Sequence, residues 1–449
     1  MSTDTVRVGA AEEAAERRRE QRGWYFYDWA CSVYSTSVLT VFLGPYLTAV
    51  AKHAADADGF VHPLGVPVRA GSFFAYAVSA SVILSIFVMP IAGAAADRTG
   101  RKKPLLAAAA YLGAGATAGM FFLDGDRYLL GGLLLIVANA SLAVSMVLYN
   151  SYLPQIAPPE ERDAVSSRGW AFGYAAGALV LVANLILFTA HDSFGVSEAT
   201  AVRICLASAG VWWGAFTLVP LRRLRDRRTA SAGQASAHGW RQLAATLRDM
   251  RGKPLTLSFL LAYLIYNDGI QTVISQASVY GSEELGLSQS TLIVAVLLVQ
   301  VLAVGGALGM GRLARTYGAK RTILGSLVAW TLTLGAGYFL PAGAPVWFFV
   351  LAAGIGLVLG GSQALSRSLF SHLVPSGKEA EYFSAYEMSD RGMSWLGPLL
   401  FGLTYQLTGS YRDAIISLVV FFALGFVLLA RVPIRQAIRD AGNPVPERI

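Results

Sequence analysis

Apolar runs of about 20 residues recur along the whole chain, and each is long enough to cross a bilayer core of roughly 30 Å as a helix. No other feature restricts the fold so strongly. Of the 449 residues, 55% are hydrophobic and 14% are charged, whereas a soluble globular protein carries about 25% charged residues. The runs are continuous and do not alternate with polar residues, which argues against a β-barrel. The sequence therefore predicts an all-α, multi-pass membrane protein.

The apolar runs can be placed as twelve transmembrane helices in two pseudo-symmetric six-helix halves. The first half spans 24–220 and the second 254–431, with a basic linker at 221–253 and tails at 1–23 and 432–449. The expected helices are 24–50, 71–96, 105–123, 128–150, 167–190, 200–220, 254–280, 289–311, 322–340, 346–369, 382–407 and 411–431. An even number of spans places both tails on the same side of the membrane.

The basic residues indicate which side that is. Most of the 36 Lys and Arg residues lie in the two tails and in the even-numbered connections, including Arg222, Arg223 and Arg225 of the linker. Cytoplasmic loops carry such an excess of Lys and Arg. We therefore expect a protein of the cell membrane with both termini and the linker in the cytoplasm. The uneven distribution also supports twelve spans, because the loss of one span would scramble it.

The cysteines, the histidines and the net charge argue against other classes of protein. Cys31 and Cys205 are too few for a disulfide framework or a zinc site, and the histidines show no ligand spacing, so we expect no metal and no cofactor. The net charge of +8 is typical of basic cytoplasmic loops, and we expect no nucleic-acid partner. The sequence holds neither a Walker-type phosphate loop nor a nucleophile beside a base, so neither an ATP-driven pump nor an enzyme is expected.

A short basic loop occurs twice, once in each half. In both copies a glycine is followed seven residues later by a second glycine and then by basic residues. The first copy holds Gly93, Asp97, Arg98, Gly100 and Arg101. The second copy runs from Gly311 to Arg321, with Arg315 where Asp is expected. The repeat suggests one duplicated unit, and a duplicated bundle of membrane helices is the usual architecture of a secondary transporter.

Ionisable residues inside spans are costly and usually mark function. In helix 24–50, Asp28 and Ser32 share one face, and Tyr27 lies beside the acid. Asp28 either lines a substrate cavity or sits at the cytoplasmic mouth, where it pairs with a basic loop residue or caps a helix.

Asp268 lies near the midplane of helix 254–280, with Asn267 beside it and Gln271 on the same face. A desolvated carboxylate without a partner can take up and release a proton near neutral pH, which proton coupling requires. The alternative is a structural hydrogen bond to a neighbouring helix.

Polar residues of three further helices complete the expected site. Asn139 and Gln363 are expected in the cavity, and the expected charge network consists of Arg367, Glu387, Asp390 and Arg391. Glu387 and Arg391 have the i, i+4 spacing of an ion pair within one helix. Alternatively, Arg367 pairs with Glu387 or Asp390 between helices and locks the cytoplasmic side. Small residues, among them Gly305, Gly306 and Gly309, are expected to let helices approach closely.

Several stretches carry a resemblance to a known family. They are Tyr27-Asp28-Trp29-Ala30, Ser166-Ser167-Arg168-Gly169, Tyr266-Asn267-Asp268-Gly269, Gln363-Ala364-Leu365-Ser366-Arg367-Ser368 and the segment from Pro375 to Pro398. With the 93–103 loop, they make the chain similar to the vacuole-effluxer-like branch of the major facilitator superfamily. That branch is related to the fungal vacuolar amino acid effluxer of autophagy, and the resemblance spans the whole chain.

The resemblance implies a secondary active transporter that moves a small polar metabolite, amino-acid-like by preference, by alternating access. The drive is expected to be the proton gradient, with sodium as the alternative ion, and the protein is expected to be a monomer in the lipid bilayer. In this superfamily, the contact of the Asp97 position with a helix N-terminus is thought to latch the cytoplasmic side; Arg315 cannot do the same. The alternative function is a non-transporting receptor or assembly platform on the same fold.

Overall fold

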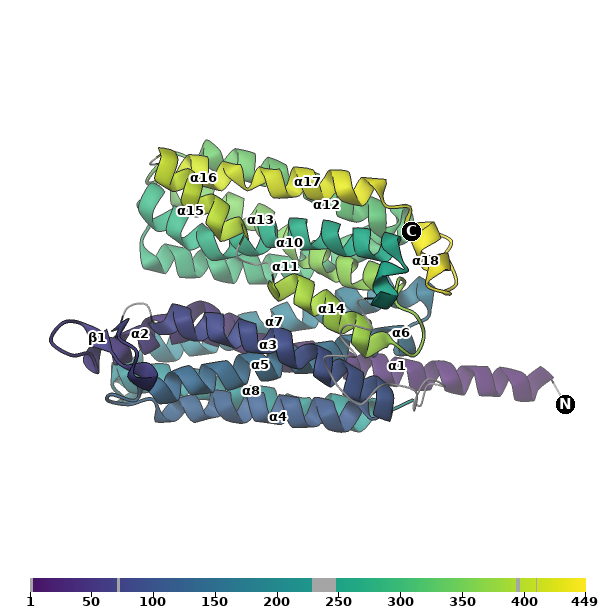
Figure 1. Cartoon of the computed structure of the whole chain (residues 1–449), viewed down its shortest axis with the longest axis horizontal. Coiled ribbons are helices and arrows are strands. Elements are labelled where there is room, and N and C mark those ends of the chain that lie inside the picture. Colours follow the sequence, from purple (N-terminus) through teal and green to yellow (C-terminus); the bar gives the residue numbers. More distant parts are fainter. Residues whose placement is uncertain (1–2, 71–72, 228–247, 393–395, 409) are drawn as a thin grey trace. The chain divides into compact units, whose positions relative to one another are not determined.

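A computed structural model of the chain describes residues 3–70, 73–227, 248–392, 396–408 and 410–449. Long helices dominate it (Figure 1). The strands in the described ranges form one antiparallel hairpin, which pairs Phe60 with Arg69 and Val61 with Val68. The contacts divide the chain into two compact units, made of Met1–Asn150 with Ala175–Gln234 and of Ser151–Tyr174 with Ala235–Ile449. We call them unit 1 and unit 2.

Unit 1 consists of long helices that pack side by side. Helix α1 packs on α8, α3 packs on α5, and α4 packs on both α5 and α8. The elements are α1 (Thr3–Val33), the π-helix η1 (Tyr34–Phe42), α2 (Leu43–His53), β1 (Phe60–Val61), η2 (Pro63–Gly65), β2 (Val68–Arg69), α3 (Phe73–Thr99), α4 (Lys102–Gly119), η4 (Met120–Phe122), α5 (Tyr128–Asn150), η6 (His191–Phe194) and α8 (Glu198–Arg223).

Unit 2 is also helical, and α13 packs most extensively on α11. Its elements are α6 (Leu153–Ile156), η5 (Pro159–Glu161), α10 (Pro254–Val279), η7 (Tyr280–Glu284), α11 (Gln289–Tyr317), α12 (Ala319–Tyr338), α13 (Pro345–Ser371), α14 (Glu379–Gly392), α15 (Leu396–Thr408), α16 (Tyr411–Ser417), α17 (Val419–Arg431) and α18 (Ile434–Asp440). Helix α7 (Arg162–Thr189) contributes its residues up to Tyr174 to unit 2 and the remainder to unit 1.

The predicted helices correspond to helices of the structure. Helix 128–150 is α5, and helix 254–280 is α10, which ends at Val279. By length and composition, ten helical stretches of the described residues can cross a membrane, and neither α12 nor the pair α14 and α15 is among them. The all-helical, multi-pass fold therefore stands, and the total of twelve spans stays a prediction.

Several helix boundaries differ from the expected ones. The 1–23 tail and the 24–50 helix are continuous, because α1 runs from Thr3 to Val33 and leads into η1 and α2. Glu20 and Gln21 are buried, so the end of the expected tail belongs to the packed structure. The expected helix 382–407 is described as α14 and α15, on either side of 393–395, and helix 411–431 as α16 and α17.

The segment 151–174 groups with unit 2, although the sequence assigned it to the first half. Arg162 explains this grouping. Its buried guanidinium donates hydrogen bonds to the carbonyls of Ala157 at 3.2 Å and Ser371 at 2.8 Å. A buried cation needs such acceptors, and they tie the start of α7 to the end of α13. The division into two six-helix halves stays a prediction.

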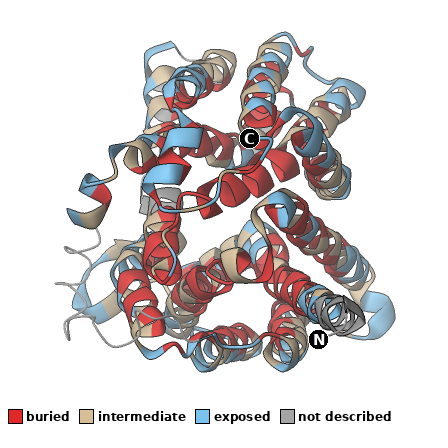
Figure 2. Cartoon of the chain, turned by 90° about the vertical axis from the view of Figure 1, so that its right-hand side faces the viewer, coloured by how far each residue is buried: buried red, intermediate tan, exposed pale blue. Residues whose placement is uncertain are grey.

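Within each unit, buried residues lie on the inner faces of the helices and exposed residues on the outer faces (Figure 2).

Glycine lets α11 and α13 pack backbone against backbone. A Cβ atom at Gly306 would collide with the main chain of Leu357, and one at Gly360 would collide with the Ala303 carbonyl. Gly305 and Gly309, expected to have the same role, have no atom within 4 Å of the position of a Cβ.

Replacement of Gly306 by Ala is predicted to destabilise the protein, because the added carbon must displace the backbone of α13. Overpacking of this kind costs about 1–3 kcal/mol. Thermal unfolding in detergent should show a lower midpoint for Gly306→Ala than for the wild type. The matched controls Gly305→Ala and Gly309→Ala add the same carbon to open space and should not lower the midpoint. Equal midpoints for all three variants would contradict the proposed packing.

Candidate functional site

The corner between α3 and α4 carries the first copy of the basic loop. Gly93 and Asp97 are buried in the last turns of α3, whereas Arg98 is half-buried and Arg101 is exposed. Gly100 has a φ of 61°, a left-handed conformation that glycine adopts without steric cost.

The Asp97 carboxylate is paired within this corner. It lies 3.5 Å from Lys102 Nζ, and each side chain is 5% exposed. Lys102 is the first residue of α4, so the acid lies beside the start of that helix. A buried charge without an opposite charge would be costly, and this pairing therefore stabilises the corner.

The chain that follows α8 also holds this corner. Asp226 accepts the backbone N–H of Lys103 at 2.9 Å. The first N–H groups of a helix have no partner inside the helix, and an acid there also complements the helix dipole. The two flanking arginines pair with acids of α1, as Arg225–Glu16 and Arg227–Glu20.

The second copy of the loop, between α11 and α12, is held without an acid at residue 315. Gly318 has a φ of 90°, so both copies use their second glycine for left-handed backbone. The carbonyl of Arg315 accepts a hydrogen bond from Arg448 at 3.2 Å. Lys320 Nζ donates to the carbonyls of Ala430 and Val432 at 2.9 and 2.8 Å. These cations satisfy carbonyls at the ends of α11 and α17.

The segment 432–449, expected as a tail, packs on unit 2. Ile434 and Ile438 of α18 are buried. Asn443 Nδ2 donates to the carbonyls of His372 at 2.9 Å and Val374 at 2.7 Å, just after the end of α13. In each unit, therefore, the chain after the last long helix returns to hold the corner with the basic loop.

Asp28 of α1 is 4% exposed and accepts a hydrogen bond from the Tyr149 hydroxyl at 2.6 Å. The Trp24 ring stacks on the Tyr149 ring with centroids 4.3 Å apart, and the Tyr27 ring lies 5.1 Å from the same ring. The tyrosine ring that binds the acid thus packs against two further aromatic rings, and Ser32 is half-buried one turn further along the helix. Tyr149 is a partner that the sequence did not suggest.

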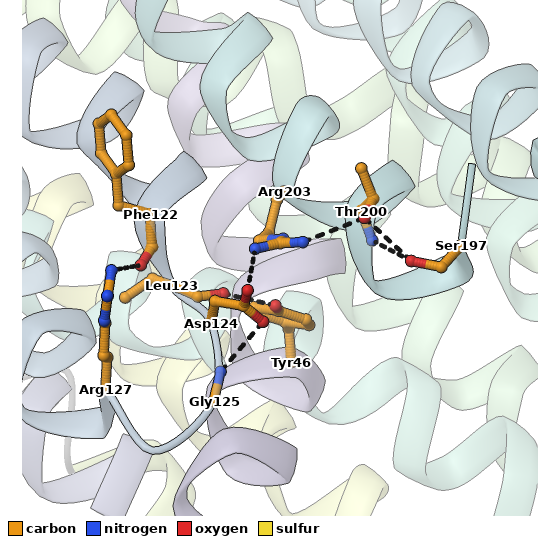
Figure 3. Close-up of polar contacts among 9 residues, drawn as sticks. All are labelled: Tyr46, Phe122, Leu123, Asp124, Gly125, Arg127, Ser197, Thr200 and Arg203. Atoms are coloured by element: carbon orange, nitrogen blue, oxygen red, sulfur yellow. Dashed lines mark hydrogen bonds and ion pairs between the residues drawn. The ribbon is translucent and has the colours of Figure 1, made fainter.

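Two further polar contacts hold the helices of unit 1 together. Asn139 Nδ2 of α5 donates to Ser81 Oγ of α3 at 2.7 Å. At the far end of α4, Figure 3 shows Arg203 of α8 beside Asp124, at 3.0 Å, and beside the Thr200 hydroxyl. The second contact fixes the connection between α4 and α5 to α8.

Arg367 of α13 is almost fully buried and binds the start of α7. Its Nε donates to Ser166 Oγ and its Nη2 donates to the Ser166 carbonyl, both at 2.9 Å. Ser166 in turn donates to the Ala364 carbonyl at 2.7 Å. The guanidinium also lies 5.4 Å from the Trp170 ring centroid, a favourable cation–π distance. Ser166 and Trp170 are thus partners of Arg367 that the expected charge network omitted.

The neighbouring turns of α13 make two more contacts. Gln363 Oε1 accepts a hydrogen bond from the Tyr174 hydroxyl of α7 at 3.0 Å. The hydroxyls of Ser366 and Tyr266 are 2.6 Å apart, which joins α13 to α10. The stretch from Gln363 to Arg367 therefore connects α13 with both α7 and α10.

Asp268 of α10 is 3% exposed. Its Oδ2 accepts the backbone N–H of Gly397 at 2.8 Å, and its buried Oδ1 has no hydrogen-bond partner among the described residues. Asn267 is buried beside it, and Gln271 is half-buried one turn later. Of the two alternatives for Asp268, the structural hydrogen bond to a neighbouring helix is therefore present at Oδ2.

The expected charge network is described only in part. Glu387 is buried, and the side chains of Asp390 and Arg391 lie outside the described residues. Both expected pairings of these residues therefore stay predictions. Among the described residues, no group of three or more His, Cys, Asp or Glu side chains could hold a metal ion.

Known proteins that match this chain place it in a family. The model of the family described as "Vacuole effluxer Atg22 like" matches residues 16–442. This chain belongs to that family. An uncharacterized MFS-type transporter of Bacillus subtilis is 29% identical over 419 residues, covering 92% of this chain and 95% of the relative. Autophagy-related protein 22-1 of Aspergillus niger is 25% identical over 554 residues, covering 94% and 90%.

Solved structures show the same fold. The major facilitator superfamily transporter FucP, crystallised in the outward conformation, matches with a TM-score of 0.65 and 13% identity over 92% of this chain and 98% of that one. The human organic anion transporter MFSD10 matches with a TM-score of 0.68 and 13% identity over 92% and 99%. The resemblance inferred from the motifs is thus confirmed, and the chain is a membrane transporter of this superfamily.

Loss of the Ser166 hydroxyl is predicted to destabilise the contact between α7 and α13. Ser166→Ala leaves the buried Nε–H of Arg367 without its acceptor, which costs about 1–3 kcal/mol or more for a charged group. The thermal midpoint in detergent should fall. Ser371→Ala is the matched control, because among the described residues its buried hydroxyl bonds only to the carbonyl of Ser368 on its own helix. Equal midpoints for the two variants would contradict the role of Ser166.

The buried His372 is predicted to lower the stability of the folded protein at acidic pH. Burial, and then the nearby Arg162 guanidinium, hold the pKa of His372 well below its usual range. Above pH ~6.5 the ring is neutral in both folded and unfolded chains; below it, only the unfolded chain binds the proton, so stability decreases. The thermal unfolding midpoint should decrease as the pH is lowered from ~7 to ~5. His372→Gln should make this decrease with pH, the slope, smaller. An unchanged slope in the variant would contradict this prediction.

Proposed function

We propose that this protein is a secondary active transporter that carries a small polar metabolite, amino-acid-like by preference, and is driven by protons. The observation that carries the proposal is Asp268: a buried carboxylate in a membrane-spanning helix, with one oxygen that has no hydrogen-bond partner among the described residues. Such residues usually mark ion or substrate pathways. Asn267, Gln271 and Gln363 would line the cavity in unit 2, and Tyr27, Asp28, Ser32 and Asn139 would line it in unit 1.

The repeated corners support transport by alternating access between two six-helix halves. Both copies of the basic loop turn at a glycine with positive φ, which supports a common origin of the two halves. Duplicated helix bundles of this kind rock about a central site. Arg367, with its hydrogen bonds to Ser166, would be part of the cytoplasmic lock, and Asp97 would belong to the cytoplasmic gate.

The charge distribution supports a place in the cell membrane with both termini in the cytoplasm. The partners would be the substrate, the lipid bilayer and the coupling ion, with sodium as the alternative to the proton, and the protein would act as a monomer. A non-transporting receptor or platform is not favoured, since the relatives bear the names of a transporter and an effluxer family.

The test uses purified protein in liposomes that contain a pH-sensitive dye. Amino acids, short peptides, sugars and nucleosides are added one class at a time, and the internal pH is followed. The proposal expects a pH change with amino acids that is absent from empty liposomes. If no class of compound changes the internal pH under a proton gradient, but uptake occurs under a sodium gradient, sodium would take the place of the proton as the coupling ion.

Asp268→Asn is predicted to abolish accumulation of substrate against a gradient and to retain binding and substrate exchange. The amide keeps the shape and the acceptor oxygen of the side chain but cannot be charged. The measurements are substrate uptake driven by a pH gradient and counterflow exchange in the same liposomes. A variant that still accumulates substrate would show that Asp268 is not the coupling residue.

A further inference from the structure

The carboxylate of Asp268 is bound to a backbone amide of another helix. Gly397 lies on α15, and its backbone N–H lies 2.8 Å from Asp268 Oδ2. A hydrogen bond to an ionised acceptor is roughly twice as strong as one to a neutral acceptor. The bond is therefore stronger when Asp268 is ionised than when it is neutral.

The approach of the two helices requires glycine at residue 397. A Cβ atom there would collide with the side chain of Thr272, which lies one turn after Asp268 on α10. Thr272 is fully buried, and its hydroxyl donates to the Asp268 carbonyl at 2.7 Å. The position of Thr272 is therefore fixed, and a side chain at residue 397 would move α15 away from Asp268.

No charged side chain on the elements packed against α10 is paired with Asp268 in the part of the chain whose side chains are described. These side chains are Arg367 on α13, Glu284 on η7, Arg431 on α17, Glu379, Glu381 and Glu387 on α14, and Arg435, Arg439 and Asp440 on α18, while α15 carries none. Among the described residues, the hydrogen-bond partner of the Asp268 carboxylate is the Gly397 amide, which is bound to Oδ2. The bond to α15 therefore responds directly to the charge of Asp268.

We propose that Gly397 is a positioning residue for coupling: its amide holds the ionised Asp268 on α15, and proton uptake by Asp268 weakens this bond between α10 and α15. This inference rests on the proposed proton coupling at Asp268. It identifies α15 as the element that moves when the proton binds, and Thr272 as the residue that sets the distance.

The test compares Gly397→Ala, Thr272→Ala and the double variant Gly397→Ala/Thr272→Ala with the wild type in liposomes. Gly397→Ala should lower proton-driven accumulation about tenfold, corresponding to ~1.4 kcal/mol, and lower the number of protons moved per substrate, while exchange persists. In the double variant, removal of the Thr272 hydroxyl should restore part of the accumulation and part of the number of protons moved per substrate. A purely structural role would lower accumulation and exchange together and leave the proton ratio unchanged, which would overturn the inference.

Gly309→Ala serves as the control for an added methyl group, because it enters open space on α11. If Asp268→Asn uncouples transport but Gly397→Ala does not, the inference fails and the proposed function stands. If Asp268→Asn still accumulates substrate, the proposed function fails and the inference with it.

Hydrogen–deuterium exchange covers the case in which Gly397→Ala does not fold. The peptide that contains 396–403 should exchange faster in Asp268→Asn than in the wild type, because the Gly397 amide loses its charged acceptor. A peptide from α12 is the internal reference. Equal exchange of the 396–403 peptide in both proteins would overturn the inference.

Discussion

Lipid offers no hydrogen bonds, so every polar group inside these helices needs its partner within the protein. The arrangement of unit 2 follows largely from this constraint. The guanidinium of Arg367 donates to both oxygens of Ser166, and Arg162 donates to the Ser371 carbonyl at the end of α13. Both cations lie between α7 and α13, and they explain why residues up to Tyr174 group with unit 2. These buried cations therefore contribute to the packing of α7 on α13, together with the apolar residues around them.

The two basic loops solve one problem with different chemistry. Each must end a helix, turn and start another, and each does so with glycine in a left-handed conformation, at Gly100 and Gly318. The free groups at the helix ends then need partners. Asp226 binds an N–H at the start of α4, whereas Arg448 binds a carbonyl at the end of α11. An acid complements a helix start and a base a helix end, so the exchange of Asp for Arg at residue 315 does not leave the second corner unsupported.

Apolar periodicity and the motifs were enough to predict the helices, the superfamily and the family, because the length of a span and the left-handed glycines are local properties. The partners of the buried polar residues were not predictable in the same way. Tyr149 for Asp28 and Gly397 for Asp268 lie more than 100 residues away, and the second partner is a backbone amide that no side-chain pattern reveals. The stretches that carried the family resemblance contained Ser166 and Gly397, and were the one signal that could have drawn attention to them.

Two close helix contacts in unit 2 show how a packed bundle can be fixed in one place and responsive in another. Gly306 and Gly360 bring α11 and α13 together through backbone contacts that contain no ionisable group, so no change of charge can loosen them. The contact between α10 and α15 also depends on a glycine, but there the same residue donates its N–H to a carboxylate. Close approach is thus common to both contacts, and in the proposed mechanism the carboxylate makes the second one sensitive to a proton. A membrane helix bundle needs both kinds of contact if one part is to move while the remainder keeps its shape.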